Sequence, residues 1–361
     1  MQFPLLSLLL AVAGATGDDA AGWPRGDAAE AGLSATRLQD LDAAIRAAKY
    51  PKVGSVAIAR HGRLVHEAYF DGDARTLRDT RSATKSITSV LVGMAIGAHA
   101  LGGVDARVLA LLPDRARRAQ SPSAAKDRMT VEDLLTMSSP LECDDWNDAS
   151  RGNEERMYVI EDWAQFFVDL PLRGRMHVGR TPASPPYGRW FSYCTAGVFL
   201  LGEVLQRATG MPADVYAEKK LFAPLGIARA EWVYSPTGAP QTGGGLRLAT
   251  VDLLEIAQLY LNGGTWNGAR LVDEAWVQTS TRPHARIDEH TEYGYLWWLE
   301  SFAAGGVEHR AFLMSGNGGN KVVGIPSLDL AVAITSTNYN TRGMHEVTDK
   351  LLVEVLGAVS P

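Results

Sequence analysis

The stretch from Ser82 to Ala98 constrains the fold of this chain more than any other. Its sequence, SATKSITSVLVGMAIGA, is small and apolar almost all round, which predicts a helix that is buried on most of its sides. Such a helix needs a large structure around it. With 361 residues, of which 46% are hydrophobic and 21% charged, we expect one large globular domain or two lobes packed closely together.

Strand patterns lie near both ends of the chain. Ser34 opens an amphipathic helix that ends near Tyr50, and runs 54–60 and 63–70 read as strands joined by the hairpin dipeptide His61-Gly62. Helical patterns then cover 131–137, 161–170, 196–208, 213–221 and 250–261, and strand patterns return at 293–298, 311–314, 321–325 and 328–336 before a closing helix over 348–359.

This order of elements predicts an α+β fold. We expect an antiparallel sheet flanked by helices, built from residues 31–81 and 290–361, and a mostly helical second lobe over residues 82–289. The two would form one domain with the active site in the cleft between them.

The first residues carry a targeting pattern. Pro4 to Ala15 is apolar but too short to span a bilayer, and small residues follow it, so we predict a signal peptide over residues 1–17 and a periplasmic or secreted location. The segment before Pro4 has no Lys or Arg, and a buried N-terminal helix is the alternative. No later run of eighteen apolar residues predicts a membrane span.

Charge and cysteine content limit the partners. The net charge of −6 and the absence of a Lys/Arg run argue against a nucleic-acid partner and favour a small molecule or peptide. Cys143 and Cys194 either form a disulfide in an oxidising compartment or remain two buried thiols. The eight histidines are scattered without zinc-ligand spacing, so we expect no metal and no organic cofactor, and the oligomeric state stays open.

Ser82 and Lys85 are the candidate catalytic pair. Three residues apart at the start of a helix, they lie on one face, where a lysine that loses its proton can act as base for a serine nucleophile. The alternative is a capping serine and a solvated lysine, but a lysine in an apolar helix is normally paired or functional. Ser123 and Lys126 have the same spacing, and we expect them to lie in a polar loop.

Tyr193, in FSYCTAG, is the candidate for relaying a proton between the lysine and the leaving group. The ordered set SATKSITSVLVGMAIG, FSYCTAGVFLLGEVLQRATG, GGGLRLATVDLLEIAQLYLNGG, YGYLWW and SGNGGN resembles the β-lactamase-related serine hydrolases, which include penicillin-binding proteins, class C β-lactamases, esterases and 6-aminohexanoate oligomer hydrolases. The resemblance runs from about residue 33 to the end.

The resemblance implies acyl transfer through an acyl-enzyme on Ser82, with Lys85 and Tyr193 moving protons. It implies an oxyanion hole formed by the backbone N–H of Ser82 and one near Asn317, with Ser315 and Gly316 beside it. Two positions depart from the family pattern. Thr195 stands where the β-lactamase Tyr-x-Asn motif has Asn, and Met314 stands where Lys-Thr-Gly has its lysine.

The loss of that lysine removes a cation that would bind a substrate carboxylate, so we expect neutral esters or amides rather than penicillins or D-Ala-D-Ala peptides. Arg247 either restores a charge nearby or is an ordinary surface arginine. The literal Tyr-x-Asn, Tyr260-Leu261-Asn262, ends a helix before two glycines and reads as a cap.

Further residues are candidates for the cleft. The aromatic ones are Trp146, Tyr295, Trp297 and Trp298, which pack in the core if they do not contact substrate. The polar ones are Asp144, Asp145 and Asn147, which hydrogen-bond the substrate or are solvated in a loop. Three functions follow: an exported esterase or amidase, a β-lactamase or D,D-peptidase, and a catalytically silent protein that binds a peptide or cell-wall fragment in the same cleft.

Overall fold

The centre of the molecule is an eight-stranded antiparallel sheet. The computed structural model describes residues 23–174 and 185–360, and the strand order is β2-β1-β13-β12-β11-β10-β9-β8. The strands are β1 (Val53–Arg60), β2 (Arg63–Tyr69), β8 (Ala285–Arg286), β9 (Glu292–Tyr293), β10 (Trp298–Ala304), β11 (Val307–Gly316), β12 (Asn320–Ile325) and β13 (Leu330–Ser336). Because β1 pairs with β13, the two ends of the chain share one sheet, as the predicted α+β class requires.

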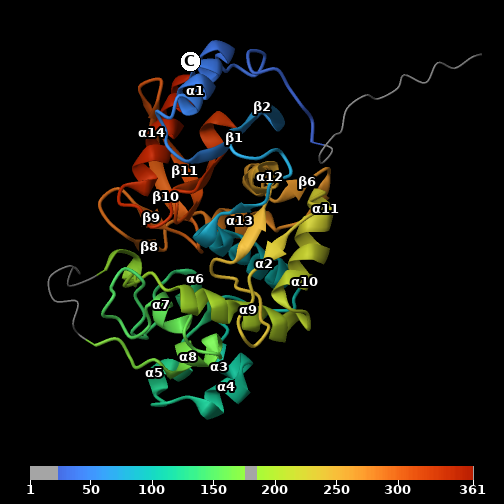
Figure 1. The fold of residues 1–361 in the computed structure, drawn as a ribbon. Coiled ribbons are helices and arrows are strands. Elements are labelled where there is room, and N and C mark those ends of the chain that lie inside the picture. Colours follow the sequence, from blue (N-terminus) through green and yellow to red (C-terminus); the bar gives the residue numbers. More distant parts are fainter. Residues whose placement is uncertain (1–22, 175–184, 361) are drawn as a thin grey trace, which may run out of the picture.

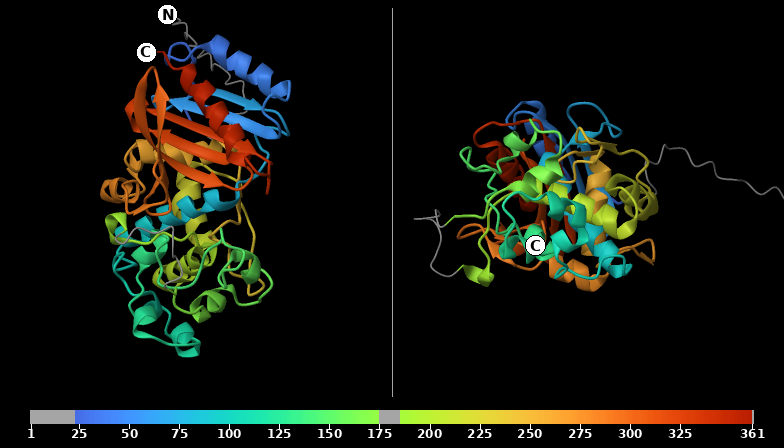
Figure 2. Two further views of the ribbon diagram at one scale, coloured as in Figure 1. Left: turned by 90° about the vertical axis from the view of Figure 1, so that its left-hand side faces the viewer. Right: turned by 90° about the horizontal axis from the view of Figure 1, so that it is seen from below.

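Helices cover both faces of this sheet (Figures 1 and 2). Helix α1 (Ala35–Arg46), which begins at the predicted cap Ser34, lies beside α14 (Met344–Gly357) on one face. Helices α2 (Thr84–Gly97) and α12 (Thr250–Leu261) lie on the other. The pleat sends alternate residues to the two cores: Val323 joins the core with α1 and α14, and Val322 the core with α2.

Most of the remaining helices gather beyond α2, in the lower part of Figure 1. Helix α9 (Thr195–Thr209) packs against α2 and α8 (Trp163–Asp169). The others are α3 (Val108–Leu111), α4 (Pro113–Arg118), α5 (Ala124–Asp127), α6 (Val131–Leu135), α7 (Glu154–Met157), α10 (Ala213–Ala217), α11 (Ala223–Leu225) and α13 (Glu274–Ser280). Although α12 falls within residues 82–289, it packs on β1, β12 and β13 of the sheet.

Two small sheets complete the fold. The first has the order β3-β5-β4, with β3 (Arg78–Asp79), β5 (Leu246–Leu248) and β4 (Glu231–Trp232), and the second pairs β6 (Thr265–Trp266) with β7 (Ala269–Arg270). The first matters for the site because β3 leads directly into the turn that carries Ser82, and β5 follows three glycines, of which Gly244 faces this turn.

One predicted strand is wrong. The run 293–298 was expected to be continuous, but β9 ends at Tyr293 and β10 begins only at Trp298. The Gly294 amide donates to the Trp297 carbonyl, and Leu296 has φ of 60°, so the segment between the strands is a tight turn. Aromatic composition favours a strand, but here the turn buries the side chains between the two strands.

Within residues 23–174 and 185–360, no helix is long and apolar enough to cross a membrane. The predicted signal peptide, residues 1–17, lies outside the described residues.

Candidate active site

Ser82 lies in a turn that joins β3 to the buried helix α2. The turn is a single 3-10 segment, Arg81–Ala83, so Ser82 precedes the α-helix rather than forming its first residue. The end of β11 presses against this turn: a Cβ on Gly316 would lie 1.9 Å from the Thr80 carbonyl oxygen and 3.1 Å from the Ala83 amide nitrogen. Only glycine allows this approach, which brings the backbone near Asn317 to Ser82.

Lys85 is buried directly behind Ser82, with 1% of its surface exposed. Its Nζ is 3.0 Å from Ser82 Oγ, 2.9 Å from Thr195 Oγ1 and 2.5 Å from the Gly243 carbonyl oxygen. A deprotonated amine has two N–H groups and one lone pair. If Thr195 and Gly243 accept those two N–H groups, the lone pair points at the Ser82 hydroxyl.

The electrostatics of Lys85 suit a base. Burial lowers its pKa from 10.5 to about 8, and the negative charges of Glu154 and Asp145 partly oppose that change. Burial disfavours the ammonium form because the charge loses its hydration. A pKa near 8 leaves a useful fraction of neutral amine at neutral pH, where a general base is most effective.

Tyr193 closes the group of predicted catalytic residues. Its side chain is 6% exposed, and Lys85 Nζ lies 4.9 Å from the centre of its ring. Burial raises the pKa of the Tyr193 hydroxyl, and a hydrogen bond with Ser82 acts in the opposite direction. The hydroxyl therefore stays protonated through the neutral range and faces the serine.

Tyr193 is held by a loop over residues 142–154, which we call the clamp loop. A disulfide joins Cys143 of this loop to Cys194, which decides between the bridge and the two free thiols left open by the sequence. The Ser192 hydroxyl donates to the Cys143 carbonyl at 2.6 Å, so the clamp loop is fixed on both sides of Tyr193.

Asp145 is the centre of the clamp loop and does not face open space. Its Oδ2 accepts the Thr195 amide at 2.6 Å and its Oδ1 accepts the Glu154 amide at 3.0 Å. It thereby satisfies the first amides of both α9 and α7. Burial raises the pKa of Asp145 to about 7, and the charge of Glu154 adds to the increase. Both carboxylate oxygens are thus engaged with the backbone rather than directed at a substrate.

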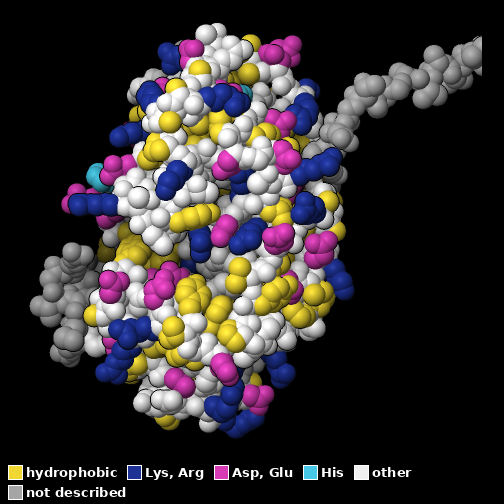
Figure 3. All heavy atoms as spheres, in the orientation of Figure 1, with side chains coloured by type: hydrophobic (Ala, Val, Ile, Leu, Met, Phe, Trp, Pro, Cys, Tyr) yellow, Lys and Arg dark blue, Asp and Glu magenta, His cyan; other side chains and the backbone are white. Residues whose placement is uncertain are grey.

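The predicted aromatic residues separate into two groups. Trp146 is 58% exposed and stacks on Tyr193 at 5.4 Å between ring centres, and Trp298 lies 5.8 Å from Tyr193. These two flank the predicted catalytic residues. On the face drawn in Figure 3, hydrophobic side chains gather around the middle of the molecule. Trp297 and Tyr295 belong to the core, at 0% and 2% exposure.

The other predicted loop and strand residues have mainly structural contacts. Asp144 Oδ1 accepts the Trp146 amide, and Asn147 Oδ1 accepts the Ala149 amide. The Asn317 side chain donates to Asn340 Oδ1 and accepts the Asn340 amide, so it is engaged with the segment after β13. Ser315 pairs with Lys321 in the β11–β12 register.

The charges near Ser82 explain why the Met314 position matters. Met314 is fully buried and provides no cation. Arg247 is 44% exposed and lies 3.8 Å from Asp79 and 3.6 Å from Glu231. Arg81 also pairs with Asp79, at 3.2 Å. Both arginines are therefore already neutralised by carboxylates.

The expectation for the second Ser-x-x-Lys sequence, Ser123 to Lys126, is wrong. Lys126 was expected in a polar loop, but it is 1% exposed. Its Nζ donates to the carbonyls of Gln120 and Val168, while Ser123 Oγ accepts the Lys126 amide. Ser123 is thus a helix cap and its lysine ties two segments together, so this pair is not a catalytic one.

Sequence reasoning missed Gly243 and Gln241. The Gly243 amide donates to Gln241 Oε1 at 2.9 Å while its carbonyl accepts Lys85. A Cβ on Gly243 would lie 2.8 Å from the Thr195 side chain. The run of three glycines before β5 was the available signal, because consecutive glycines mark close backbone approach.

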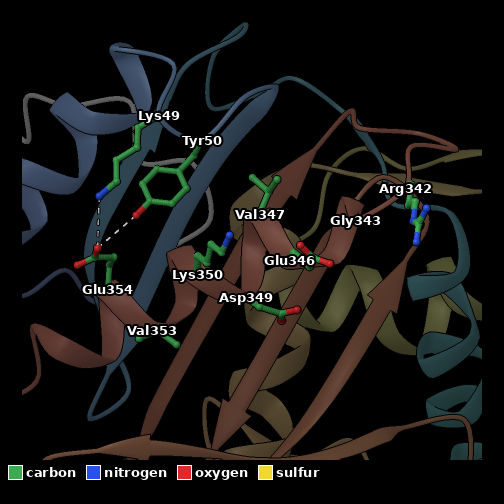
Figure 4. A pocket seen from close by; sticks show the side chains of 10 residues that line it. All are labelled: Lys49, Tyr50, Arg342, Gly343, Glu346, Val347, Asp349, Lys350, Val353 and Glu354. Atoms are coloured by element: carbon green, nitrogen blue, oxygen red, sulfur yellow. Dashed lines mark hydrogen bonds and ion pairs between the residues drawn. The ribbon is translucent and has the colours of Figure 1, made fainter.

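A separate surface groove of about 820 Å³ lies between α14 and the segment after α1 (Figure 4). Its side chains include Lys49, Tyr50, Lys350 and Glu354, and Glu354 accepts a hydrogen bond from Tyr50. Ser82, Lys85 and Tyr193 are not among its residues. In the described parts of the chain, no group of three or more His, Cys, Asp or Glu is placed to hold a metal ion.

The fold and the grouping of Ser82, Lys85 and Tyr193 are those that the resemblance implies. The family model described as Beta-lactamase matches residues 41–356, and the chain belongs to the Beta-lactamase family. This confirms the resemblance and the fold that it implies.

Individual relatives agree with that assignment. The chain is 26% identical over 182 residues to a 6-aminohexanoate-dimer hydrolase of Paenarthrobacter ureafaciens. The aligned region covers 47% of this chain and 45% of the relative. The chain spans about half the length of the curated relatives that it matches.

Two solved structures show the same fold. EstCE1, a hydrolase with promiscuous acyltransferase activity, has a TM-score of 0.68 at 16% identity, over 91% of this chain and 98% of that one. A class C β-lactamase mutant has a TM-score of 0.62 at 16% identity, over 89% and 96%.

Proposed function

We propose that this chain is an exported serine hydrolase that cleaves a neutral ester or amide through an acyl-enzyme on Ser82. Lys85 takes the Ser82 proton, and Tyr193 passes a proton to the leaving group. The observation that carries the proposal is the arrangement around Lys85 Nζ, where Thr195 and Gly243 accept two bonds and Ser82 lies at the third position. Ser82 and Lys85 are therefore already in the contact that the proton transfer requires.

The reaction has two steps. In the first, Ser82 Oγ bonds to the substrate carbonyl carbon, its proton passes to Lys85, and the leaving group departs with a proton relayed by Tyr193. In the second, water adds to the acyl carbon and gives up a proton, the bond between that carbon and Ser82 Oγ breaks, and Ser82 Oγ takes up a proton as the carboxylic acid leaves. The backbone amides of Ser82 and Asn317 stabilise the oxyanion, and Gly316 makes this possible by its contact with Thr80.

The charges near Ser82 favour neutral substrates. With Met314 buried and both Arg81 and Arg247 paired with Asp79, a substrate carboxylate would have no unpaired cation among these residues. The names of the 6-aminohexanoate-dimer hydrolase and of the promiscuous hydrolase EstCE1 support acyl transfer in this fold. The Cys143–Cys194 disulfide supports export, because such bonds persist in oxidising compartments.

The direct test is intact mass spectrometry of the protein after exposure to a fluorophosphonate and, separately, to a penicillin. We expect one fluorophosphonate adduct and no lasting penicillin adduct. A penicillin adduct would favour a β-lactamase or D,D-peptidase instead. A folded protein that neither reagent labels would contradict the hydrolase proposal and favour a silent binding protein.

The rate of acylation should depend on pH in a defined direction. Since only neutral Lys85 accepts a proton and its pKa is about 8, we expect the labelling rate to rise about tenfold per pH unit below 8 and to level off above it. Tyr193 stays protonated over this range and adds no second limb. The measurement is the second-order fluorophosphonate labelling rate between pH 5.5 and 9.5, and a flat profile would exclude Lys85 as the base.

A further inference from the structure

The clamp loop does more than hold Tyr193, because it belongs to a closed ring of hydrogen bonds that includes Lys85. One half of the ring runs from Lys85 to Thr195 Oγ1, then from the Thr195 amide to Asp145, whose other oxygen accepts the Glu154 amide. Asp145 therefore connects the first acceptor of Lys85 to the start of helix α7.

The other half of the ring returns through Glu154. Its Oε2 accepts the Tyr158 hydroxyl at 3.2 Å, and Tyr158 in turn accepts Gln241 Nε2 at 3.4 Å. Gln241 Oε1 accepts the Gly243 amide at 2.9 Å, and the Gly243 carbonyl accepts Lys85. The Thr195 acceptor is thus linked to the Asp145 carboxylate and the Gly243 acceptor to the Glu154 carboxylate, and the two halves of the ring meet where the Glu154 backbone amide donates to Asp145.

The ring also supplies the charge that acts on Lys85. Asp145 and Glu154 are the carboxylates whose negative charge raises the pKa of Lys85 against the effect of burial. The remaining titratable neighbour is Tyr193, whose ring lies 4.9 Å away. Arg81, at the start of the same helical segment, is directed at Asp79 and at the Tyr339 ring. From β11, Met314 and Gly316 contribute no charge.

We propose that Glu154 is a positioning residue for Lys85: its carboxylate holds the Gly243 acceptor through Tyr158 and Gln241, its backbone amide anchors Asp145 behind Thr195, and its charge sets the pH range in which Lys85 can take the Ser82 proton. This role rests on the proposed function of Ser82 and Lys85 and extends it to residues that touch neither substrate nor Ser82. Hydrogen-bonded buried networks of this kind fix one geometry because each member satisfies its neighbours.

The position of the ring relative to solvent gives it a second property. Lys85 and Gln241 are buried at 1% and 2% exposure, whereas Tyr158 is 40% exposed. The ring therefore connects the buried amine to the protein surface at Tyr158. Replacing Glu154 with glutamine removes this charge without removing any atom that contacts Ser82.

The test is the pH profile of fluorophosphonate labelling for wild type, Glu154→Gln and Glu155→Gln. Glutamine keeps the size of the side chain and an oxygen acceptor for Tyr158 but removes the charge. We expect the midpoint of the Glu154→Gln profile to move down by about one pH unit, so that this variant labels several-fold faster than wild type at pH 6 relative to its own plateau. Glu155 is exposed, so Glu155→Gln removes the same charge one residue away and should leave the midpoint unchanged.

Tyr158→Phe separates position from charge. It removes the hydroxyl that joins Glu154 to Gln241 but keeps both carboxylates, so we expect the plateau rate to fall several-fold while the midpoint moves by less than about a quarter of a unit. It also provides a second measurement if Glu154→Gln does not fold.

The outcomes separate this proposal from the proposed function. Wild type that does not label at all contradicts the function of Ser82 and Lys85. If wild type labels with a midpoint near pH 8 but the Glu154→Gln rate is lowered by the same factor at every pH, the proposed role of Glu154 is overturned. The proposed function of Ser82 and Lys85 then still stands.

Discussion

Replacing Ser82 with alanine should abolish acylation and lower the hydrolysis of a chromogenic ester by about 10⁵-fold or more, because the residual rate comes only from binding and the oxyanion hole. Replacing Lys85 with methionine should lower the same rate by about 10² to 10⁴-fold, the usual contribution of a general base. The measurements are kcat/KM for a p-nitrophenyl ester and the fluorophosphonate adduct by mass.

The chain offers a matched control for this prediction. Ser123→Ala changes a serine with the same Ser-x-x-Lys spacing, but Ser123 only caps its own helix and Lys126 binds two carbonyls elsewhere. We expect full activity in this variant. An adduct that persists in Ser82→Ala with unchanged rate would place the nucleophile on another residue.

The second large effect concerns the disulfide. Replacing Cys143 and Cys194 together with serine opens a loop of 51 residues, and the chain-entropy estimate gives a loss of about 4 kcal/mol in the free energy of unfolding. Both cysteines are buried, so the new hydroxyls add a desolvation cost. Urea denaturation of the oxidised wild type and the double variant measures the difference.

This substitution should also affect the reaction, because Cys194 lies between Tyr193 and Thr195. Without the bridge, the clamp loop is still tied to residues 192–195 by the Ser192 hydroxyl, by the Asp145 amide, which donates to the Tyr193 carbonyl, and by the Asp145 carboxylate. We expect the acylation rate to fall at temperatures where the variant is still folded. Equal urea midpoints for the two proteins would show that the bridge does not contribute to stability.

The features predicted correctly from the sequence depend on local spacing. Ser82 and Lys85 are three residues apart, so the geometry of one turn places their side chains together. Ser34 is the predicted helix cap, and the His61-Gly62 hairpin forms between β1 and β2. These contacts join residues that are close in sequence, so they need no distant segment to form.

The features that the sequence did not predict depend on distant contacts. Asp145 looked like an exposed loop carboxylate, and nothing in its neighbours indicates that it would accept the amide of a residue 50 positions away. The YGYLWW run has the composition of a strand, but the left-handed Leu296 turns it. The roles of Gly243 and Gln241 follow from a loop that tertiary packing alone brings against α2.

The hydrogen bonds of Lys85 have a consequence for how the protein matures. The hydrogen-bond partners of its Nζ lie 3, 110 and 158 residues away in sequence, so Gly243 reaches it only after distant segments have docked. Long-range contacts of this kind form late because they require large loops to close. An emerging or partly folded chain therefore holds a serine without an oriented base, and chemical competence arrives only with the finished tertiary structure. Acylation is in this sense a reporter of complete folding, and a chain that is still unfolded should not acylate Ser82.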